Sequence, residues 1–252
     1  MVQFTRNIRL DDDKFTAPEL GESEDKKPIF LAAQRYLRAF YRDRMAGKRI
    51  VDLGCLDGAH TLGFARMGFD ALGLEVRLEN FAACQYVRRH VNLPNLKYVQ
   101  DNAWNVAGYG KFDAVFCSGL LYHLDRPREF IELMGAVCCE LLILNTHFAP
   151  EHESADLPLS AMTTNEGCRG RWFVEPLDAS KEDRDRQLWS SWDNRQSFWL
   201  AKPDLLQALM DAGFPIVLEA FDFLGPAIRD SINGGYYHSQ HRNMFVAMRH
   251  AR

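Results

Sequence analysis

The sequence predicts an α/β protein: a Rossmann-like, seven-stranded, mostly parallel sheet with a C-terminal antiparallel hairpin, helices on both faces and a lid insertion. Short apolar runs alternate with amphipathic runs between residues 49 and 248, which is typical of successive βαβ units. The chain has 252 residues, of which 47% are hydrophobic and 25% charged. These values fit one α/β domain with an addition, and they exclude disordered, collagen-like and coiled-coil proteins.

Residues 1–48 precede this alternation and are expected to form an N-terminal leader and a covering helix. Residues 1–28 are rich in acidic side chains and show little apolar periodicity, which predicts a leader that adds little to the core and is either irregular and laid over the surface or partly disordered. From Pro28 the apolar residues fall on one face of a helix. We expect this helix to cover an edge of the sheet.

Residues 49–252 form the expected main domain. Its strands are predicted at 49–53, 71–74, 96–100, 112–117, 141–145, 216–220 and 244–248, and its helices at 59–66, 78–90, 127–137 and 202–212. The stretch from about 151 to 197 breaks the alternation. It combines many acidic residues with Trp172, Phe173, Trp189 and Trp192, without a clear period. A loop of this length predicts a lid or binding insertion.

A glycine turn follows the first predicted strand. Asp52 ends the run Ile50-Val51-Asp52, and Gly54 and Gly58 lie four residues apart before the next helix. Glycine permits positive φ and lets a ligand approach the backbone. Such a turn alone is equally compatible with a nucleotide-type ligand and with a plain tight turn.

Polar residues at two further strand ends favour the nucleotide. Glu75 stands 21 residues after Gly54, where a carboxylate can accept hydrogen bonds from ribose hydroxyls. Asp101 and Asn102 follow the third strand, where they could bind an adenine amino group. Ligands of open α/β sheets bind at the carboxyl ends of the strands, so these residues are expected to converge on one adenosine.

The rest of the turn distinguishes between cofactors. Leu56 occupies the place of a second glycine and Asp57 would repel a pyrophosphate, which argues against NAD; no phosphate-binding loop for ATP is present. Acidic residues such as Asp52 and Asp57 are electrostatically compatible with a cofactor in which adenosine carries a cationic amino acid. The sequence therefore predicts S-adenosyl-L-methionine as cofactor.

The segments VDLGCLDGAH, GLE, DN, FDAVFCSGLLYHLDRP and LLILNTH resemble, in order and spacing, the class I S-adenosylmethionine-dependent methyltransferases over about residues 49–148. The resemblance implies that Asp52, Gly54 and Gly58 surround the methionyl part of the cofactor. It also implies that Glu75 binds the ribose, that Asp101 and Asn102 bind the adenine, and that Ser118, with Gly119 and Leu120, lines the methyl-transfer pocket. Leu56 departs from the family's middle glycine. L-x-D-G, L-Y-H-L-x-x-P and L-L-I-L-x-T-H also resemble the branch of wobble-uridine tRNA modification enzymes.

Two histidines are candidates for a general base. Methyl transfer to a hydroxyl requires removal of its proton, and histidine commonly serves this role. His147, our first choice, and His123, our second, follow strands and are expected to face the sulfonium. Each could instead be a structural hydrogen-bond donor. Neither belongs to a tight metal-ligand spacing, so no metal is predicted.

Composition bounds the partners. Thirty Lys and Arg against 34 Asp and Glu give a formal charge of −4, which does not favour nucleic acid or an anionic membrane. Six cysteines without a CxxC pair fit a reducing compartment, and no apolar stretch is long enough to span a bilayer or act as a signal peptide. We therefore expect a cytoplasmic protein.

The leading hypothesis is a methyltransferase that transfers a methyl group to the oxygen or nitrogen of a small-molecule acceptor under the lid. The first alternative is a tRNA-modifying enzyme of the same fold, supported by a cluster of cations at Arg35, Arg38, Arg42, Arg44, Lys48 and Arg49. The second is a catalytically silent subunit that binds partners, against which Glu75 and Asp101 argue. The lid could act within one chain or across a homodimer.

Overall fold

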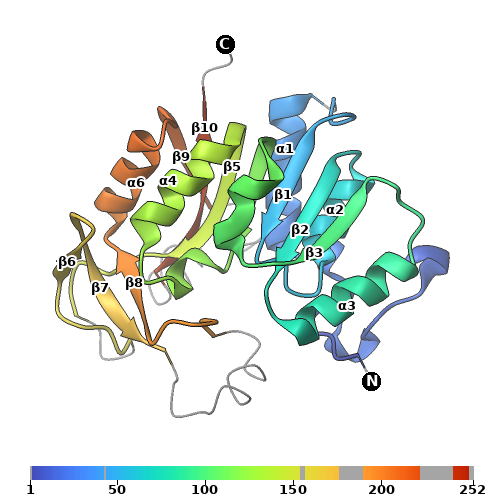
Figure 1. The fold of residues 1–252 in the computed structure, drawn as a ribbon, viewed down its shortest axis with the longest axis horizontal. Helices are drawn as coiled ribbons and strands as arrows, with labels where there is room; N and C mark the ends of the chain where they lie inside the picture. Colours follow the sequence, from blue (N-terminus) through green and yellow to red (C-terminus); the bar gives the residue numbers. More distant parts are fainter. Residues whose placement is uncertain (1, 43, 154–156, 176–189, 222–240, 250–252) are drawn as a thin grey trace. The chain divides into compact units, whose positions relative to one another are not determined.

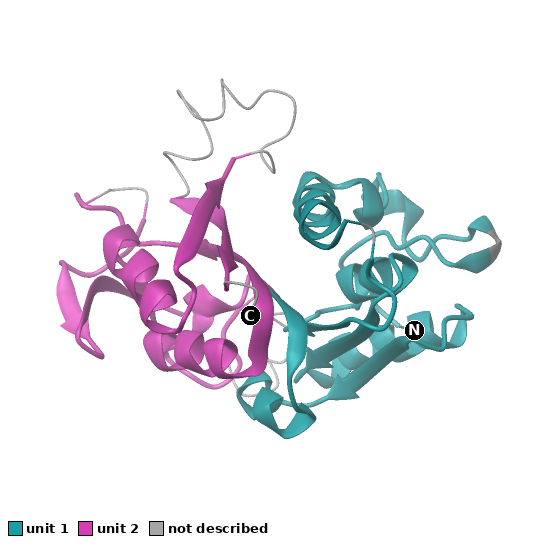
Figure 2. Ribbon diagram, turned by 90° about the horizontal axis from the view of Figure 1, so that it is seen from above, with its two compact units in different colours: residues 1–116 teal, residues 117–252 magenta. Residues whose placement is uncertain are grey.

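A computed structural model describes residues 2–42, 44–153, 157–175, 190–221 and 241–249 (Figure 1). The chain divides into two compact units, residues 1–116 and residues 117–252 (Figure 2). One seven-stranded sheet has the order β3-β2-β1-β4-β5-β10-β9, and a second sheet has the order β6-β7-β8. The predicted seven-stranded, mostly parallel sheet is confirmed, whereas the predicted boundary at residues 48 and 49 remains a prediction.

The first unit contains the parallel strands β1 (Arg49–Leu53), β2 (Asp70–Glu75) and β3 (Leu96–Gln100). Parallel neighbours require crossover connections. Here α2 (Ala59–Arg66) crosses from β1 to β2 and α3 (Leu78–Arg89) crosses from β2 to β3, each packing on the strands that it joins. The carboxyl ends of these strands carry the predicted cofactor residues.

Helix α1 (Pro28–Tyr41) packs against α2. The ring of Phe30 lies 5.9 Å from that of His60 and 5.7 Å from that of Phe64. A Cβ atom at Gly63 would approach Phe30 to 2.3 Å, so the glycine allows the two helices to come this close. The expected covering of a sheet edge remains a prediction.

The leader contributes apolar side chains to the core, contrary to expectation. It forms three short 3-10 turns, η1 (Asp11–Asp13), η2 (Pro18–Leu20) and η3 (Glu24–Lys26). Between and before them Ile8, Leu10 and Ala17 are buried. Their spacing follows turns rather than a helix or strand period, so a search for periodicity does not detect them.

The second unit contains the remaining part of the large sheet. Strand β4 (Phe112–Ser118) ends in it and is followed by η5 (Leu121–His123), α4 (Pro127–Val137) and β5 (Cys138–His147). After α6 (Lys202–Asp211), β9 (Ile216–Ala220) and β10 (Arg242–Met248) pair antiparallel, and β10 also pairs antiparallel with β5. The predicted C-terminal hairpin is thus confirmed; the polar loop at residues 236–240 lies outside the described residues.

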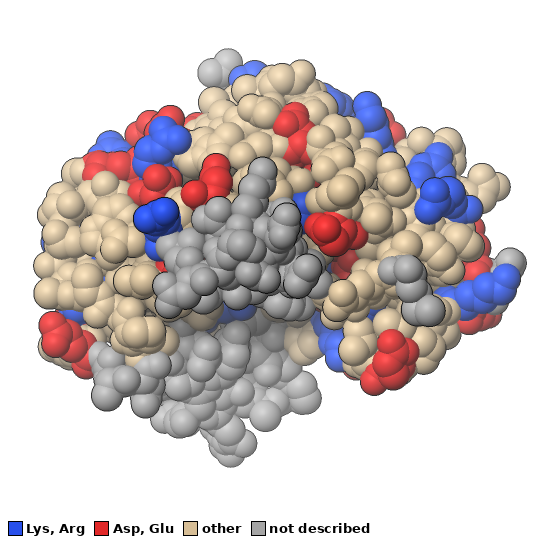
Figure 3. All heavy atoms as spheres, turned by 60° about the horizontal axis from the view of Figure 1, so that its bottom comes forward, with Lys and Arg blue, Asp and Glu red and all other residues tan. Residues whose placement is uncertain are grey.

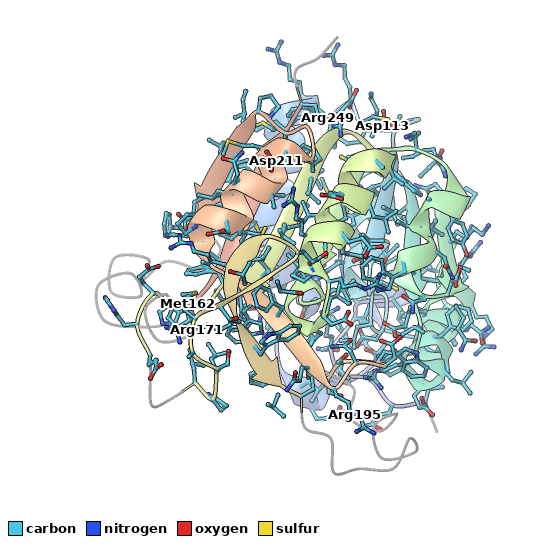
Figure 4. All side chains as sticks on the ribbon, turned by 60° about the vertical axis from the view of Figure 1, so that its left-hand side comes forward. Asp113, Met162, Arg171, Arg195, Asp211 and Arg249 are labelled. Carbon is cyan, nitrogen blue, oxygen red and sulfur yellow. The ribbon has the colours of Figure 1, made fainter. Side chains whose placement is uncertain are left out.

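The insertion contains a sheet rather than an aperiodic loop. Strands β6 (Thr163–Asn165), β7 (Cys168–Val174) and β8 (Gln196–Leu200) pair antiparallel. Arg171, labelled in Figure 4, is buried and donates hydrogen bonds to the carbonyls of Pro150, Glu151 and Ser160. Closure of this insertion over a ligand remains a prediction, and Trp189 lies outside the described residues.

Among the helices that the structure describes, none is both long and apolar enough to cross a membrane.

Candidate active site

The turn between β1 and α2 adopts left-handed backbone at three positions, with φ of 69° at Gly54, 58° at Leu56 and 84° at Gly58. The N–H groups of Gly54 and Cys55 each donate to the carbonyl of Leu74 at 3.0 Å, which fixes the turn to β2. A Cβ atom at Gly58 would approach the Tyr98 ring to 2.6 Å. Both predicted glycines are therefore required by the turn itself.

Glu75, at the end of β2, reaches back to this turn. Its Oε2 accepts the N–H of Leu56 at 2.9 Å and its Oε1 accepts the N–H of Arg77 at 2.8 Å. Burial raises the pKa of Glu75, although these backbone hydrogen bonds and one from the Asn80 side chain favour the charged form. A carboxylate has about four acceptor sites, so capacity for a ribose hydroxyl remains.

The other predicted cofactor carboxylates also have partners. Burial raises the pKa of Asp52, whose Oδ2 accepts the Thr61 hydroxyl at 2.7 Å. Asp101 accepts the Asn105 side chain and the Tyr109 hydroxyl, each at 2.7 Å, and these bonds lower its pKa. The N–H of Asp101 donates to the carbonyl of Glu75 at 3.1 Å, so the ends of β2 and β3 meet.

Asn102 begins the 3-10 helix η4 (Ala103–Tyr109), where its Oδ1 accepts the N–H of Trp104 at 3.1 Å. The first unit thus brings Asp52, Gly54, Gly58 and Glu75 together with Asp101 and Asn102 at its strand ends. Their contact with a cofactor remains a prediction. What the arrangement offers is a set of oriented carboxylates beside a tight backbone turn.

Asp57 has a structural role that its position in the sequence does not indicate. Its Oδ2 accepts the N–H groups of Thr5 and Arg6 at 3.1 and 2.9 Å, and the Thr5 hydroxyl at 2.9 Å. Arg6 also pairs with Glu24, whose Oε1 lies 2.9 Å from Nε2 of His60. The leader is therefore fastened to the glycine turn, and no pattern within the leader indicates this.

In the second unit the end of β4 leads into a histidine-bearing turn. Ser118 is half-buried, and the N–H of Gly119 donates to the carbonyl of Asn145 at 3.0 Å. His123 ends η5 with its side chain 18% exposed, and its Nδ1 lies 2.9 Å from Oε1 of Glu175, which is 1% exposed. Glu175 follows β7 and had no signal in the sequence beyond being one acid among many.

A cluster of rings surrounds this turn. His147, at the end of β5, stacks on Trp199 with centroids 4.6 Å apart and meets Tyr122 edge-on at 4.5 Å. Phe173 also stacks on Trp199, and Tyr122 lies against His123 at 4.4 Å. We call Tyr122, His123, His147, Phe173 and Trp199 the ring cluster. It brings both predicted base histidines together at the carboxyl ends of β4 and β5.

Strand β8 holds η5 in place. The indole Nε1 of Trp199 donates to the carbonyl of Tyr122 at 3.0 Å, and the N–H of Phe198 donates to the carbonyl of Leu124 at 2.8 Å. The small sheet therefore supports the turn that carries His123. Within the described ranges, no group of three or more His, Cys, Asp or Glu side chains lies close enough to hold a metal.

The model of a family described as a methyltransferase domain matches residues 29–219 of this chain. The chain belongs to this methyltransferase family. The match covers more than half of the sequence and confirms the predicted class of S-adenosylmethionine-dependent methyltransferases.

Solved structures agree with the family assignment. The N-terminal domain of EvdMO1 with SAH bound has a TM-score of 0.62 and 26% identity, with 90% of this chain and 82% of that chain covered. Magnesium protoporphyrin IX methyltransferase from Synechocystis, with SAM bound, has a TM-score of 0.54 over 88% and 80% of the chains, and its 15% identity shows the fold alone.

Two relatives of known name match shorter segments of this chain. A ubiquinone biosynthesis O-methyltransferase from Psychrobacter cryohalolentis is 31% identical over 101 residues, 39% of this chain and 38% of that protein. A tRNA U34 carboxymethyltransferase from Trichlorobacter lovleyi is 32% identical over 96 residues, 37% of this chain and 30% of that protein. The chain thus aligns with less than half of the length of either relative.

Proposed function

We propose that this protein uses S-adenosyl-L-methionine to methylate a hydroxyl group of a small, ring-bearing acceptor. The family and the SAH-bound neighbour support the cofactor, and the O-methyltransferase relative supports an oxygen acceptor. The observation that carries the proposal is the ring cluster, because it combines half-buried aromatic surfaces with an imidazole at the carboxyl ends of two strands.

The cofactor site of the proposal consists of the glycine turn, Glu75, Asp101 and Asn102. When bound, the sulfonium supplies an activated methyl group. The protein's residues then have two tasks: Glu75 and the turn orient the adenosine, and acidic Asp52 favours the cationic end electrostatically. Ser118, the last residue of β4, is proposed to face the transferred methyl group.

The acceptor is held against the ring cluster. Aromatic side chains bind planar groups by offset or edge-on stacking, which is worth about 0.5–1.5 kcal/mol per pair beyond burial. The acceptor oxygen attacks the methyl carbon, an O–C bond forms, and the C–S bond breaks with its electron pair left on sulfur. The hydroxyl proton passes to an imidazole nitrogen, so charge and atoms balance.

The experiment is a transfer assay with methyl-labelled S-adenosylmethionine. A set of phenols and catechols is compared with the same compounds whose hydroxyls are already methylated, and with bulk tRNA. We expect label only in compounds with a free hydroxyl. Label in the capped compounds or in tRNA alone would contradict the proposal.

A tRNA-modifying activity is the second candidate, favoured by the match to the tRNA carboxymethyltransferase. Two of the cationic side chains that suggested this activity, Lys48 and Arg49, are already engaged in contacts within the protein. Lys48 Nζ lies 2.8 Å from Asp113, and Arg49 donates to the carbonyls of Lys111 and Tyr109. This weakens the case for a dedicated RNA-binding surface.

A further inference from the structure

A buried carboxylate, Glu175, lies beside His123, one of the two candidate bases, and has no part in the proposed binding of cofactor or acceptor. Glu175 is 1% exposed, and an isolated charge at that depth carries a large desolvation cost unless it is paired. Its Oε1 lies 2.9 Å from Nδ1 of His123 and accepts the Ser197 hydroxyl at 2.8 Å. Its Oε2 accepts the N–H of Ser191 at 3.2 Å.

This arrangement selects one tautomer of His123. A carboxylate only accepts hydrogen bonds, so Nδ1 must carry the proton that lies between the two groups. In the neutral imidazole, Nε2 is then the ring nitrogen with an acceptor lone pair, and the carboxylate stabilises the imidazolium that forms when Nε2 takes a proton. Ser197 and Ser191 hold the carboxylate so that it cannot rotate away from the ring.

We infer that Glu175 is a positioning residue that fixes His123 with Nε2 as the base toward the acceptor hydroxyl. The inference rests on the proposed function, and it makes His123 rather than His147 the group that takes the proton. His147 stacks on Trp199 and lies perpendicular to Tyr122, a placement among aromatic rings that is suited to binding a ring.

The hydrogen bonds of Glu175 also indicate a role for the insertion, which is to position His123 and its carboxylate partner. Glu175 follows β7, Ser197 lies in β8, and β8 fastens η5 through its bonds to Tyr122 and Leu124. The base and its carboxylate come from separate elements that the small sheet locks together. Preorganisation of this kind reduces the reorganisation needed when the proton moves.

Glu175→Gln tests the inference sharply. The N–H of Ser191 requires an oxygen at the position of Oε2, so the amide nitrogen falls at the position of Oε1 and donates to Nδ1 of His123. The ring is then forced into the wrong tautomer, with its proton on Nε2. We expect kcat to fall about a hundredfold to ten-thousandfold, with unchanged affinity for S-adenosylhomocysteine.

Two readouts separate this role from a structural one. Nitrogen-15 NMR of the histidines should show a protonated Nδ1 at His123 in the wild type and a protonated Nε2 in Glu175→Gln. The rate loss should also shrink for acceptors acidic enough to ionise by themselves, because they need no base. Glu129→Gln, an exposed acid paired with Arg126, is the matched control and should change neither readout.

The outcomes are distinguishable. A wild-type His123 protonated at Nε2, or a kcat of Glu175→Gln within about twofold of the wild type, would overturn the inference. Absence of methyl transfer to any hydroxyl by the wild type would instead refute the proposed function, and the NMR tautomer would still decide the role of Glu175. His123→Ala should lose turnover, whereas His147→Ala should mainly raise KM for the acceptor.

Discussion

Leu56 holds a left-handed backbone conformation, with φ of 58°, in the middle of the glycine turn. For a residue with a side chain this costs roughly 1–2 kcal/mol. Its side chain is only 7% exposed, and burying a leucine contributes about 1.5–3 kcal/mol. The hydrogen bond from its N–H to Glu75 adds to this, so burial and the hydrogen bond outweigh the backbone strain.

At position 56, therefore, the glycine variant should be more stable than the alanine variant, which is the reverse of the usual order. Leu56→Ala loses the burial and keeps the strain, whereas Leu56→Gly loses the burial and relieves the strain. We expect Leu56→Gly to unfold more easily than the wild type, but to exceed Leu56→Ala in free energy of unfolding by up to about 1 kcal/mol. Urea unfolding measures both, and an alanine variant that is the more stable of the two would contradict this account.

Glu75 predicts a pH dependence of cofactor binding. Burial raises the pKa of this carboxyl in the free protein, and a ribose hydroxyl is bound best by the ionised form. Affinity for S-adenosylhomocysteine should fall as the pH is lowered through that raised pKa, because the group takes up a proton that binding must displace. Glu75→Gln should bind about tenfold to a hundredfold more weakly at neutral pH and lose much of the pH dependence.

Calorimetric titrations at several pH values provide the measurement. The control is Glu79→Gln, an exposed acid in the first turn of α3. Equal affinity of Glu75→Gln and Glu79→Gln would remove Glu75 from the cofactor site.

At the residue scale the sequence predicted the groups that lie at the carboxyl ends of strands. Asp52, Glu75 and Asp101 stand at strand ends that the apolar runs locate, and the structure places them there. Asp57 and Glu175 escaped prediction because their roles depend on Thr5, Arg6 and His123. These partners lie about 50 residues away in the sequence, brought near by tertiary packing alone.

Among the elements, the three-stranded sheet is closely packed. Strand β7 passes β8 at Gly170, where a Cβ atom would approach the carbonyl oxygen of Trp199 to 2.3 Å and the Phe198 ring to 2.5 Å. The backbone oxygen cannot yield without breaking the pairing of the two strands. Glycine at position 170 therefore allows β7 and β8 to pair with Phe198 and Trp199 at the positions where they bond to Leu124 and Tyr122.

Gly170→Ala should therefore lower the melting temperature and, with it, methyl transfer. Overpacking costs about 1–3 kcal/mol, which for a chain of this size corresponds to roughly 2–12 °C. Gly108→Ala is the control, because a Cβ atom there meets no atom within 4 Å. Differential scanning calorimetry compares the two, and equal melting temperatures would show that the sheet adjusts without cost.

The helices and the strands of the large sheet were predicted closely because each carries a clear apolar period. Helix α2 and strands β1, β3 and β9 have the expected bounds, and β5 extends the expected strand at both ends. The small sheet was not predicted, since β6 has only three residues and β7 alternates charged with apolar side chains. Its strands are specified by pairing with one another rather than by their own composition.

For the whole molecule, charge bears on the choice between acceptors. The formal charge is −4, and on the face drawn in Figure 3 the Lys and Arg side chains lie among Asp and Glu. Proteins that bind RNA backbones release counterions, so their affinity falls steeply with salt, with a slope of about 0.7–0.9 per phosphate contact. An interspersed surface provides few such contacts.

We therefore expect bulk tRNA to bind weakly, with a slope of log affinity against log salt no steeper than about −2. Filter binding between low and physiological salt measures this slope. Arg35→Glu together with Arg38→Glu, on the exposed part of α1, should leave methyl transfer to a small acceptor unchanged. A slope of −5 or steeper that these substitutions abolish would establish the tRNA-modifying candidate instead.

The fastening of Thr5 and Arg6 to Asp57 has a practical consequence for handling the enzyme. Chemistry performed near residues 5 and 6, such as tag fusion, trimming by a protease or acylation, acts on a segment that is hydrogen-bonded to the turn between β1 and α2. Cofactor affinity should therefore report whether the hydrogen bonds of Thr5 and Arg6 to Asp57 are intact. Preparations that differ only in their first few residues should be compared by their affinity for S-adenosylhomocysteine before their turnover rates are interpreted.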